Sequence, residues 1–517
     1  MQTGPNTAAI APASYTKLAE QARQIASLNA IGSLIGWDQE TYMPPQGAEG
    51  RAEQHSVLAG ILHEKRTSPQ FLEQLKACEA DAQHLPGSVE HANLRELRRD
   101  LDLATKLPTD LVSAIAKATS LAQESWKQAR ADSDFDSFAP HLAEVITLTR
   151  RKAECYGIPT FAGGKGELYD ALLNEYEPGA SAAEIDAVFK PLQVRLSALV
   201  AELCSAPRQL STQATEIGAS VPAQQAFGIE VLAAIGFDLT AGRLDQTAHP
   251  FCSGMGPGDT RLTTRYTGSS FLEPLSSTMH EAGHGLYEQG LLKVAHFGMP
   301  ISDATSLGIH ESQSRMWENF VGRSREFCTW LLPLAKRHFG PSVASLTEQQ
   351  LFESANTVRR SFIRVESDEA TYNLHVMLRF GLERELISGR LAIADLPAEW
   401  NRRFKELFGL DVPDAARGCL QDVHWSFGLV GYFPTYTLGN LYAAQIWEAI
   451  NKQIPDMPSR ISRGDFAPLL AFLRANIHQH GRRYSAGELC QRITGQPLSS
   501  EPLLRYLSGK LRPLHGL

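Results

Sequence analysis

The sequence predicts a mainly α-helical protein with one short β-rich segment near its middle. Apolar residues recur at intervals of three, four and seven through most of the chain, which is the period of an amphipathic helix. In the first such stretch they are Leu18, Ile25, Leu28, Ile31 and Ile35. Similar stretches cover 91–106, 183–204, 313–335, 347–364 and 371–389.

Proline and glycine interrupt the helical pattern at 43–47 and 156–165, where turns are expected. No low-complexity linker, no repeat of fixed period and no shift in composition divides the 517 residues. We therefore expect a single unit over 1–517. Its first part, a helical segment of about 1–240, should have no independent boundary.

The segment 249–275 departs from the helical period. It begins with a glycine-rich stretch, HPFCSGMGPGDT, and continues with RLTTRYT at 261–267, which is rich in β-branched residues and predicts a strand or hairpin arm. In zinc peptidases an edge strand beside the metal helix can bind an extended peptide through main-chain hydrogen bonds. A purely structural hairpin explains the same pattern equally well.

Composition excludes several classes of partner. With 49 basic and 57 acidic residues the net charge is −8, and no block of like charge predicts nucleic-acid binding. No run of 18 apolar residues and no cationic, apolar leader is present, so we expect no membrane segment and a cytoplasmic location. The seven cysteines are scattered and form no CxxC pair, which favours buried thiols over disulfides.

The motif HEAGH at 280–284 raises the question of a metal site. On a helix, His280 and His284 lie over one face, and Glu281 stands beside the first histidine. Gly283 and Gly285 are poor helix formers, each costing about 1 kcal/mol relative to alanine. Their presence predicts that this helix packs closely against another element. A metal site still requires a third ligand.

The third ligand has to come from outside the motif. The longer zincin pattern requires glycine at 287 and histidine at 290, whereas this chain has Tyr287 and Gly290. Glu288 lies on the same helix one turn beyond His284. From there its carboxylate would extend beyond the metal instead of completing a tetrahedral site.

Glu311 is better placed, because it lies on what reads as the next helix. Two histidines and one glutamate would leave a fourth position open for water, and Glu281 would accept the proton of that water. An ion pair with Arg315 at i,i+4 is the alternative role for Glu311. The spacing alone leaves these two roles equally open.

Several ordered motifs resemble those of a known metallopeptidase family, carboxypeptidase Taq or M32. They are HPF at 249–251, DTRLT at 259–263, HEAGH at 280–284, HESQ at 310–313, IRVESD at 363–368 and GCLQDVHW at 418–425. WDQETYMPP at 37–45 and GYFPTYTLG at 431–439 extend the likeness to nearly the whole chain from about residue 15. Ser367 departs from the family pattern, which usually has alanine at that position.

The resemblance implies a neurolysin-like zincin fold, with two helical lobes around a deep groove and a small antiparallel sheet near the metal. It also implies a homodimer, and release of single residues from the free C-termini of peptides. The metal and substrate motifs would then span 249–439. One divalent metal per chain, Zn²⁺ with Co²⁺ as a second possibility, would be bound by His280, His284 and Glu311.

Further roles follow from the same resemblance. Glu281 would be the general base. The residues expected to hold substrate or stabilise the oxyanion are His249, His424, Tyr432 and Tyr436. The sequence does not separate the two tyrosines, and without the resemblance these side chains would be interpreted as core residues.

A carboxypeptidase also needs a group that binds the terminal carboxylate of the substrate, and a guanidinium does this through two parallel hydrogen bonds. Arg364 is the first candidate and Arg261 the second. A structural salt bridge, for instance from Arg364 to Asp368, is the competing interpretation. A zinc endopeptidase on the same scaffold, which lacks such a dock, is the alternative function.

Overall fold

The computed structural model describes residues 13–81 and 87–517. Its helices are α1 (Ala13–Thr41), α2 (Ala48–Arg66), α3 (Pro69–Glu79), α4 (Val89–Lys106), α5 (Thr109–Asp132), α6 (Phe135–Tyr156), α7 (Leu168–Leu173), α8 (Ala182–Cys204), α9 (Val221–Ile235), α10 (Leu272–Gly290), α11 (Lys293–His296), α12 (Leu307–Arg315), α13 (Arg325–Phe339), α14 (Glu348–Ala355), α15 (Tyr372–Ser388), α16 (Leu396–Phe408), α17 (Pro434–Gln453), α18 (Met457–Ser462), α19 (Ala467–Asn476), α20 (Ala486–Thr494) and α21 (Glu501–His515). The strands are β1 (Thr160–Phe161), β2 (Gly164–Lys165), β3 (Gly242–Gln246), β4 (Cys252–Gly256) and β5 (Asp259–Thr264).

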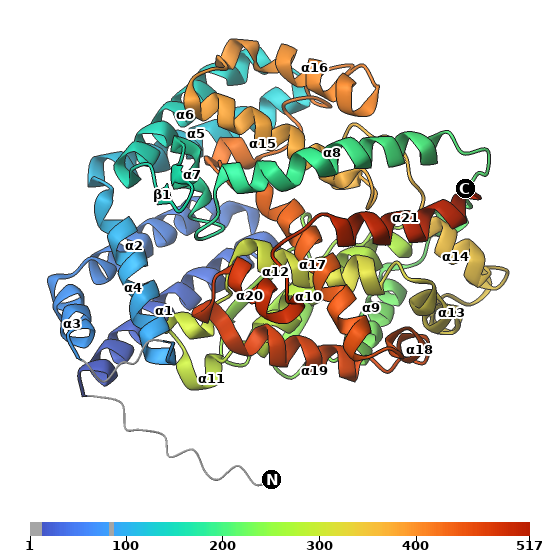
Figure 1. The fold of residues 1–517 in the computed structure, drawn as a ribbon, viewed down its shortest axis with the longest axis horizontal. Coiled ribbons are helices and arrows are strands. Elements are labelled where there is room, and N and C mark those ends of the chain that lie inside the picture. The colour runs from blue at the N-terminus through green and yellow to red at the C-terminus, as the bar shows by residue number, and fades with distance from the viewer. Residues whose placement is uncertain (1–12, 82–86) are drawn as a thin grey trace, which may run out of the picture.

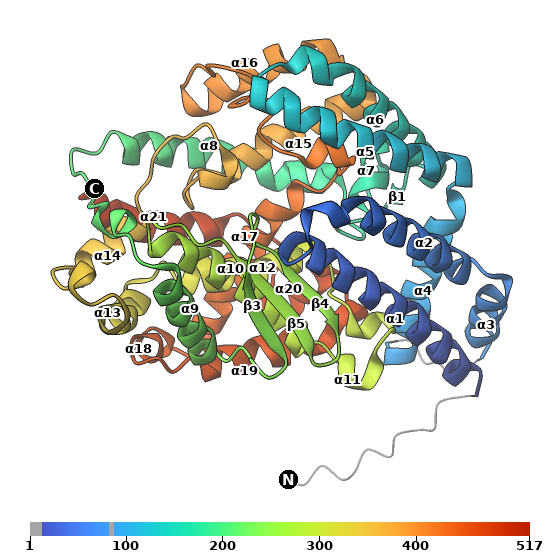
Figure 2. The same cartoon turned by 180° about the vertical axis from the view of Figure 1, so that it is seen from behind.

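The helices form two groups. Helices α5, α6, α15 and α16 lie together at the top of Figure 1, and α9–α14 with α17–α21 form the lower group. The helices α1–α4 flank both groups on one side of the molecule, as both views show (Figures 1 and 2). The mainly α-helical prediction is therefore confirmed. Among the described residues, no helix combines the length and the apolar character needed to cross a membrane.

The predicted small sheet is present, but its topology differs from the expectation. The strand order is β3-β5-β4, with β4 antiparallel to β5 and β3 parallel to β5, so the sheet is mixed rather than antiparallel. A tight turn at Gly258, with φ of 75°, joins β4 to β5. Because β5 then inserts between the two earlier strands, β3 runs in the same direction as β5. Figure 2 shows this sheet with α1 beside β4.

Most of the predicted helices form close to their expected bounds, and two do not. The stretch 313–335 divides into the end of α12, a π-helical segment η4 (Met316–Val321) and α13. The stretch 347–364 is helical only to Ala355. Beyond it the backbone N–H of Arg364 donates to the Gln421 side chain at 2.9 Å, so a tertiary hydrogen bond replaces a helical one there.

Two hydrophobic clusters are present among the described residues. The larger one includes residues of α10, α12 and α17, and the smaller one joins α1, α3 and α4 to Met299 and Ile301. The helices of the N-terminal segment thus pack directly on residues that follow the histidine helix. The single unit remains a prediction that this packing favours. All seven cysteines are free thiols, as the sequence predicts, but only four of them are buried, and Cys204 is exposed.

Candidate metal centre and substrate site

Helices α10 and α12 approach each other closely at Gly283. A Cβ atom added there would lie 2.4 Å from the carbonyl oxygen of Gln313 and 2.5 Å from the Cα of Ser314. At Gly285 an added Cβ would meet the side chains of Leu262 and Phe237. Only glycine allows this approach, which explains why two poor helix formers occupy the middle of α10. The predicted close packing of this helix is confirmed.

This approach brings the three predicted ligands together. The Oε2 atom of Glu311 lies 3.8 Å from Nε2 of His280 and 3.5 Å from Nε2 of His284. One ligand atom from each residue lies within 4.8 Å of the other two. Tetrahedral zinc, with ligands at about 2.0–2.2 Å, places them roughly 3.4 Å apart. The donor set therefore fits a divalent metal ion.

Glu281 lies next to this group and is 6% exposed. Burial raises its pKa to about 7, and the neighbouring Glu311 and Glu318 carboxylates add to the effect. A carboxyl group with a pKa near neutrality can both take up and release a proton at physiological pH.

Glu311 also forms the ion pair that was the alternative to metal binding. Arg315 Nε donates to Glu311 Oε1 at 2.7 Å, while Oε2 is the atom that faces the histidines. The two interpretations of this residue are therefore compatible, because each uses a different oxygen. Glu288, in contrast, pairs with Lys293 and lies 2.9 Å from Nε2 of His310, outside the donor group.

Arg364 is paired with Asp422 rather than with Asp368, so the suggested salt bridge to Asp368 is wrong. Arg364 Nε and Nη2 donate to Asp422 Oδ1 at 3.1 and 2.9 Å, and Arg379 Nε donates to Oδ2 at 2.6 Å. Asp368 instead accepts backbone N–H groups, including that of Thr371 at 3.0 Å. The serine at 367 fits the same loop, because its hydroxyl donates to the carbonyl of Ile363.

Tyr372 connects this arginine to the candidate metal ligands. Its hydroxyl accepts a hydrogen bond from Arg364 Nη1 at 2.7 Å, and the Arg315 guanidinium lies over its ring at 4.3 Å. Arg315 in turn holds Glu311. A continuous chain of contacts therefore runs from Glu311 of the donor group to Arg364.

His424 and the two candidate tyrosines form one aromatic cluster. His424 Nε2 lies 3.2 Å from the Tyr436 hydroxyl, and the rings of Tyr432 and Tyr436 meet edge to face at 5.4 Å. Burial lowers the pKa of His424 to about 3, with help from the Arg364 and Arg379 charges. The neutral imidazole is therefore the favoured form of His424.

Both tyrosines are neutral phenols and can donate a hydrogen bond. Burial raises the pKa of Tyr432 to about 12, with the Glu311 carboxylate contributing, and raises that of Tyr436 well above its usual value. The guanidinium of Arg364 lies over the Tyr436 ring at 4.9 Å.

Arg261 and His249 lie further from the donor group. Leu262 and Thr264 of β5 contact α10, so the alternation along a strand turns Arg261 to the opposite face of the sheet. There Arg261 donates two hydrogen bonds to Asp259, both at 2.9 Å, and lies over the Trp37 ring at 4.3 Å. His249 is exposed in the loop between β3 and β4.

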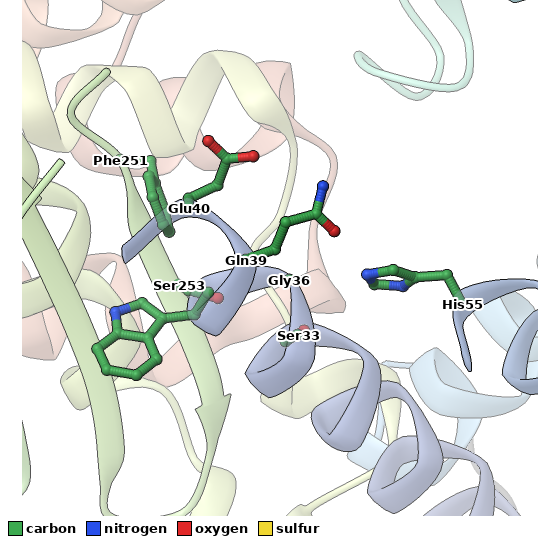
Figure 3. A pocket seen from close by; sticks show the side chains of 8 residues that line it. Ser33, Gly36, Gln39, Glu40, His55, Phe251 and Ser253 are labelled. Atoms are coloured by element: carbon green, nitrogen blue, oxygen red, sulfur yellow. The ribbon is translucent and has the colours of Figure 1, made fainter. Parts of the chain in front are cut away.

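A pocket of about 370 Å³ lies beside β4, between α1 and α2. Its lining residues are Ser33, Gly36, Trp37, Gln39, Glu40, His55, Phe251 and Ser253. Figure 3 shows Gln39 of α1 and His55 of α2 pointing toward each other across it. None of the three candidate metal ligands lines this pocket.

The structure adds residues to the site that sequence reasoning did not identify. These are Glu318, Tyr372, Arg379 and Asp422. Asp422 lies inside the GCLQDVHW motif and could have been considered on that ground. The other three carry no local sequence signal, because their roles depend on contacts between helices.

Comparison with known proteins identifies the family. The model of the carboxypeptidase Taq (M32) metallopeptidases matches residues 17–511. The chain belongs to this family. Thermostable carboxypeptidase 1 of Thermus thermophilus is 42% identical over 508 residues, which cover 98% of this chain and 99% of the relative. Thermostable carboxypeptidase 1 of Pyrococcus furiosus is 36% identical and covers 94% and 96%.

Solved structures agree with this assignment. The M32 carboxypeptidase from Deinococcus radiodurans superposes with a TM-score of 0.93 at 37% identity, covering 98% of this chain and all of that one. As an M32 metallopeptidase, the protein is a metal-dependent carboxypeptidase and hence a peptide hydrolase.

Proposed function

We propose that this M32 enzyme releases single amino acids from the free C-termini of peptides and binds one Zn²⁺ per chain through His280, His284 and Glu311. Co²⁺ suits the same donors. The observation that carries the proposal is the convergence of the three donors beside Glu281, whose carboxyl has a pKa of about 7. Nitrogen and carboxylate ligands in this number are typical of catalytic zinc sites, which leave one position for water.

The roles of the side chains follow from their positions. When bound, the metal supplies a Lewis acid that lowers the pKa of water and polarises the peptide carbonyl. Glu281 then takes the proton of the attacking water and returns it to the leaving amine. A phenol from Tyr432 or Tyr436 donates a hydrogen bond to the oxyanion. His424, which is neutral, positions the Tyr436 hydroxyl, and the exposed His249 contacts the peptide.

Arg364 is our candidate for binding the terminal carboxylate. Two guanidinium groups, Arg364 and Arg379, share the single carboxylate of Asp422, so this buried cluster carries one unbalanced positive charge. An anion that arrives with the substrate would balance it. Because Asp422 occupies Nε and Nη2 and the Tyr372 hydroxyl accepts one hydrogen of Nη1, the substrate carboxylate would bind the second hydrogen of Nη1. Arg261 is only the second candidate, because it lies on the face of the sheet opposite to α10, the helix that carries His280 and His284.

We also propose that the enzyme is a cytoplasmic homodimer. The free thiols are typical of a reducing compartment. The exposed apolar side chains of Ile31, Leu34, Val57 and Ile61 on α1 and α2 offer a surface that a second copy could cover. Sedimentation of the purified protein tests the dimer.

One experiment tests the main proposal. Metal content is measured on the purified protein, which is then incubated with a peptide of known sequence, and the products are identified by mass spectrometry. We expect one divalent metal per chain and a ladder of products that shortens only from the C-terminus. Internal fragments without such a ladder would support the alternative, a zinc endopeptidase on the same scaffold.

A further inference from the structure

The helix that carries Glu311 changes its geometry directly after Arg315. Residues Met316–Val321 form the π-helical segment η4, and all six are buried. Such segments are rare, and they occur frequently at functional sites because they shift the side chains that follow. In this chain Glu318 belongs to the π-helical segment, and its side chain lies beside the proposed metal ligands.

Glu318 is surrounded by four donors. Its Oε2 atom lies 2.8 Å from Nδ1 of His280 and accepts a hydrogen bond from Arg315 Nη1 at 3.0 Å. Its Oε1 atom accepts from Arg323 Nη2 at 3.3 Å and from the hydroxyl of Ser276 at 3.4 Å. Burial disfavours a charge here, yet the Arg315 and His280 partners outweigh it and hold the pKa of Glu318 far below its usual value.

The contact with His280 determines which ring nitrogen can bind a metal. A carboxylate accepts only from a protonated nitrogen, so Nδ1 of His280 carries the hydrogen and Nε2 presents its lone pair. Nε2 is the atom that faces Glu311. Glu318 therefore fixes both the tautomer and the orientation of this ring.

Arg315 connects Glu318 to the third ligand. It donates to Glu311 through Nε and to Glu318 through Nη1, and its guanidinium rests on the Tyr372 ring. Two carboxylates that would repel each other are thus held at a fixed separation by one cation. Glu318 and Arg315 together fix one donor on α10 and one on α12.

We propose that Glu318 is a positioning residue of the metal centre, delivered by the π-helical segment to hold His280 for metal binding, with Arg315 coupling it to Glu311. This inference rests on the proposed ligand roles of His280 and Glu311. It goes beyond those roles because it assigns a function to a residue outside the donor group.

The test uses Glu318→Gln and Glu318→Ala, with Glu353→Gln as the matched control. Glu353 is also a buried glutamate paired with an arginine, since it accepts from Arg208 at 2.7 Å and from the Ser211 backbone at 3.0 Å, but it lies on α14. Zinc affinity is measured by competition with a chromophoric chelator. The melting temperature of the metal-free proteins and the visible absorption spectrum of their Co²⁺ forms are recorded as well.

Partners of metal-bound histidines typically change metal affinity by about 10- to 100-fold when removed. We expect that loss in Glu318→Ala and a smaller loss, roughly three- to tenfold, in Glu318→Gln, which keeps an acceptor without the charge. Both should alter the Co²⁺ spectrum. Glu353→Gln should change neither affinity nor spectrum.

Two results would overturn the inference. One is zinc affinity within twofold of wild type and an unchanged Co²⁺ spectrum in Glu318→Gln, which retains size and shape and so remains informative even where Glu318→Ala does not fold. The other is a lower melting temperature of the metal-free protein with metal binding unaffected, which indicates a purely structural role. Glu311→Ala distinguishes failure of the ligand assignment from failure of this inference. Full metal retention in Glu311→Ala contradicts the ligand assignment itself. Loss of metal in Glu311→Ala, together with normal metal binding in the Glu318 variants, contradicts only the inference about Glu318.

Discussion

Amidation of the C-terminus of a peptide should greatly reduce kcat/KM, because the buried cluster around Arg364 then receives no anion. Arg364 is 5% exposed and Arg379 is fully buried, and they share one carboxylate. Removing one member of a buried charge pair costs about 2–5 kcal/mol. At about 1.4 kcal/mol per factor of ten, this equals roughly 30-fold to several-thousand-fold in kcat/KM.

The assay compares one peptide in three forms: free, C-amidated and N-acetylated. Wild type should show the full loss of kcat/KM on amidation and little change on acetylation, because Arg364 is proposed to bind only the terminal carboxylate. Arg364→Lys keeps a positive charge for Asp422 but lacks the Nη1 atom proposed to bind the substrate carboxylate, so the amidation penalty should shrink in that variant.

Arg379→Lys is the matched control. It perturbs the same carboxylate from the other side but leaves the guanidinium of Arg364 intact, so its amidation penalty should remain at the wild-type level. Equal cleavage of free and amidated peptides by wild type would refute the carboxypeptidase geometry. If the amidation penalty is undiminished in Arg364→Lys but reduced in Arg261→Lys, Arg261 is the residue that binds the terminal carboxylate.

Three further outcomes are expected. Glu281→Gln should retain its metal and lose about 10²- to 10⁴-fold in kcat, the usual contribution of a general base, and near-normal turnover would contradict that role. Glu311→Ala should lose stoichiometric metal by elemental analysis while its far-UV circular dichroism stays helical. Glu177, which accepts the Gly308 N–H at 3.0 Å, has its pKa raised by burial from 4.5 to about 7. Its folded-state pKa exceeds the unfolded one, so ionisation of Glu177 should cost wild type about 3 kcal/mol of stability as the pH rises from 4.5 to above 7, and the loss in Glu177→Gln should be smaller by about that amount. Melting curves of both proteins at pH 5 and pH 8 check this, and parallel shifts in the two would count against it.

Much of the fold was predictable because local patterns are sufficient for helices. Ser181 caps α8 through a capping box with Glu184, and the predicted helix at 183–204 forms almost to the residue. The candidate donor set could also be predicted, since HEAGH places two histidines one turn apart, and the sequence placed Glu311 on a later helix, which the structure shows as α12. What the pattern could not predict was the pairing of β3, because strand direction depends on which strands become neighbours.

The sequence by itself therefore determined the helical period, the family motifs and the chemical nature of the candidate metal ligands, all of which depend on residues near one another in the chain. Only the tertiary structure decided which charges meet. Arg364 binds Asp422 rather than Asp368, His424 is neutral, and Glu318 lies beneath His280. Each of these depends on burial and on contacts between separate helices. Desolvation and charge pairing act through space, so no spacing along the chain specifies them.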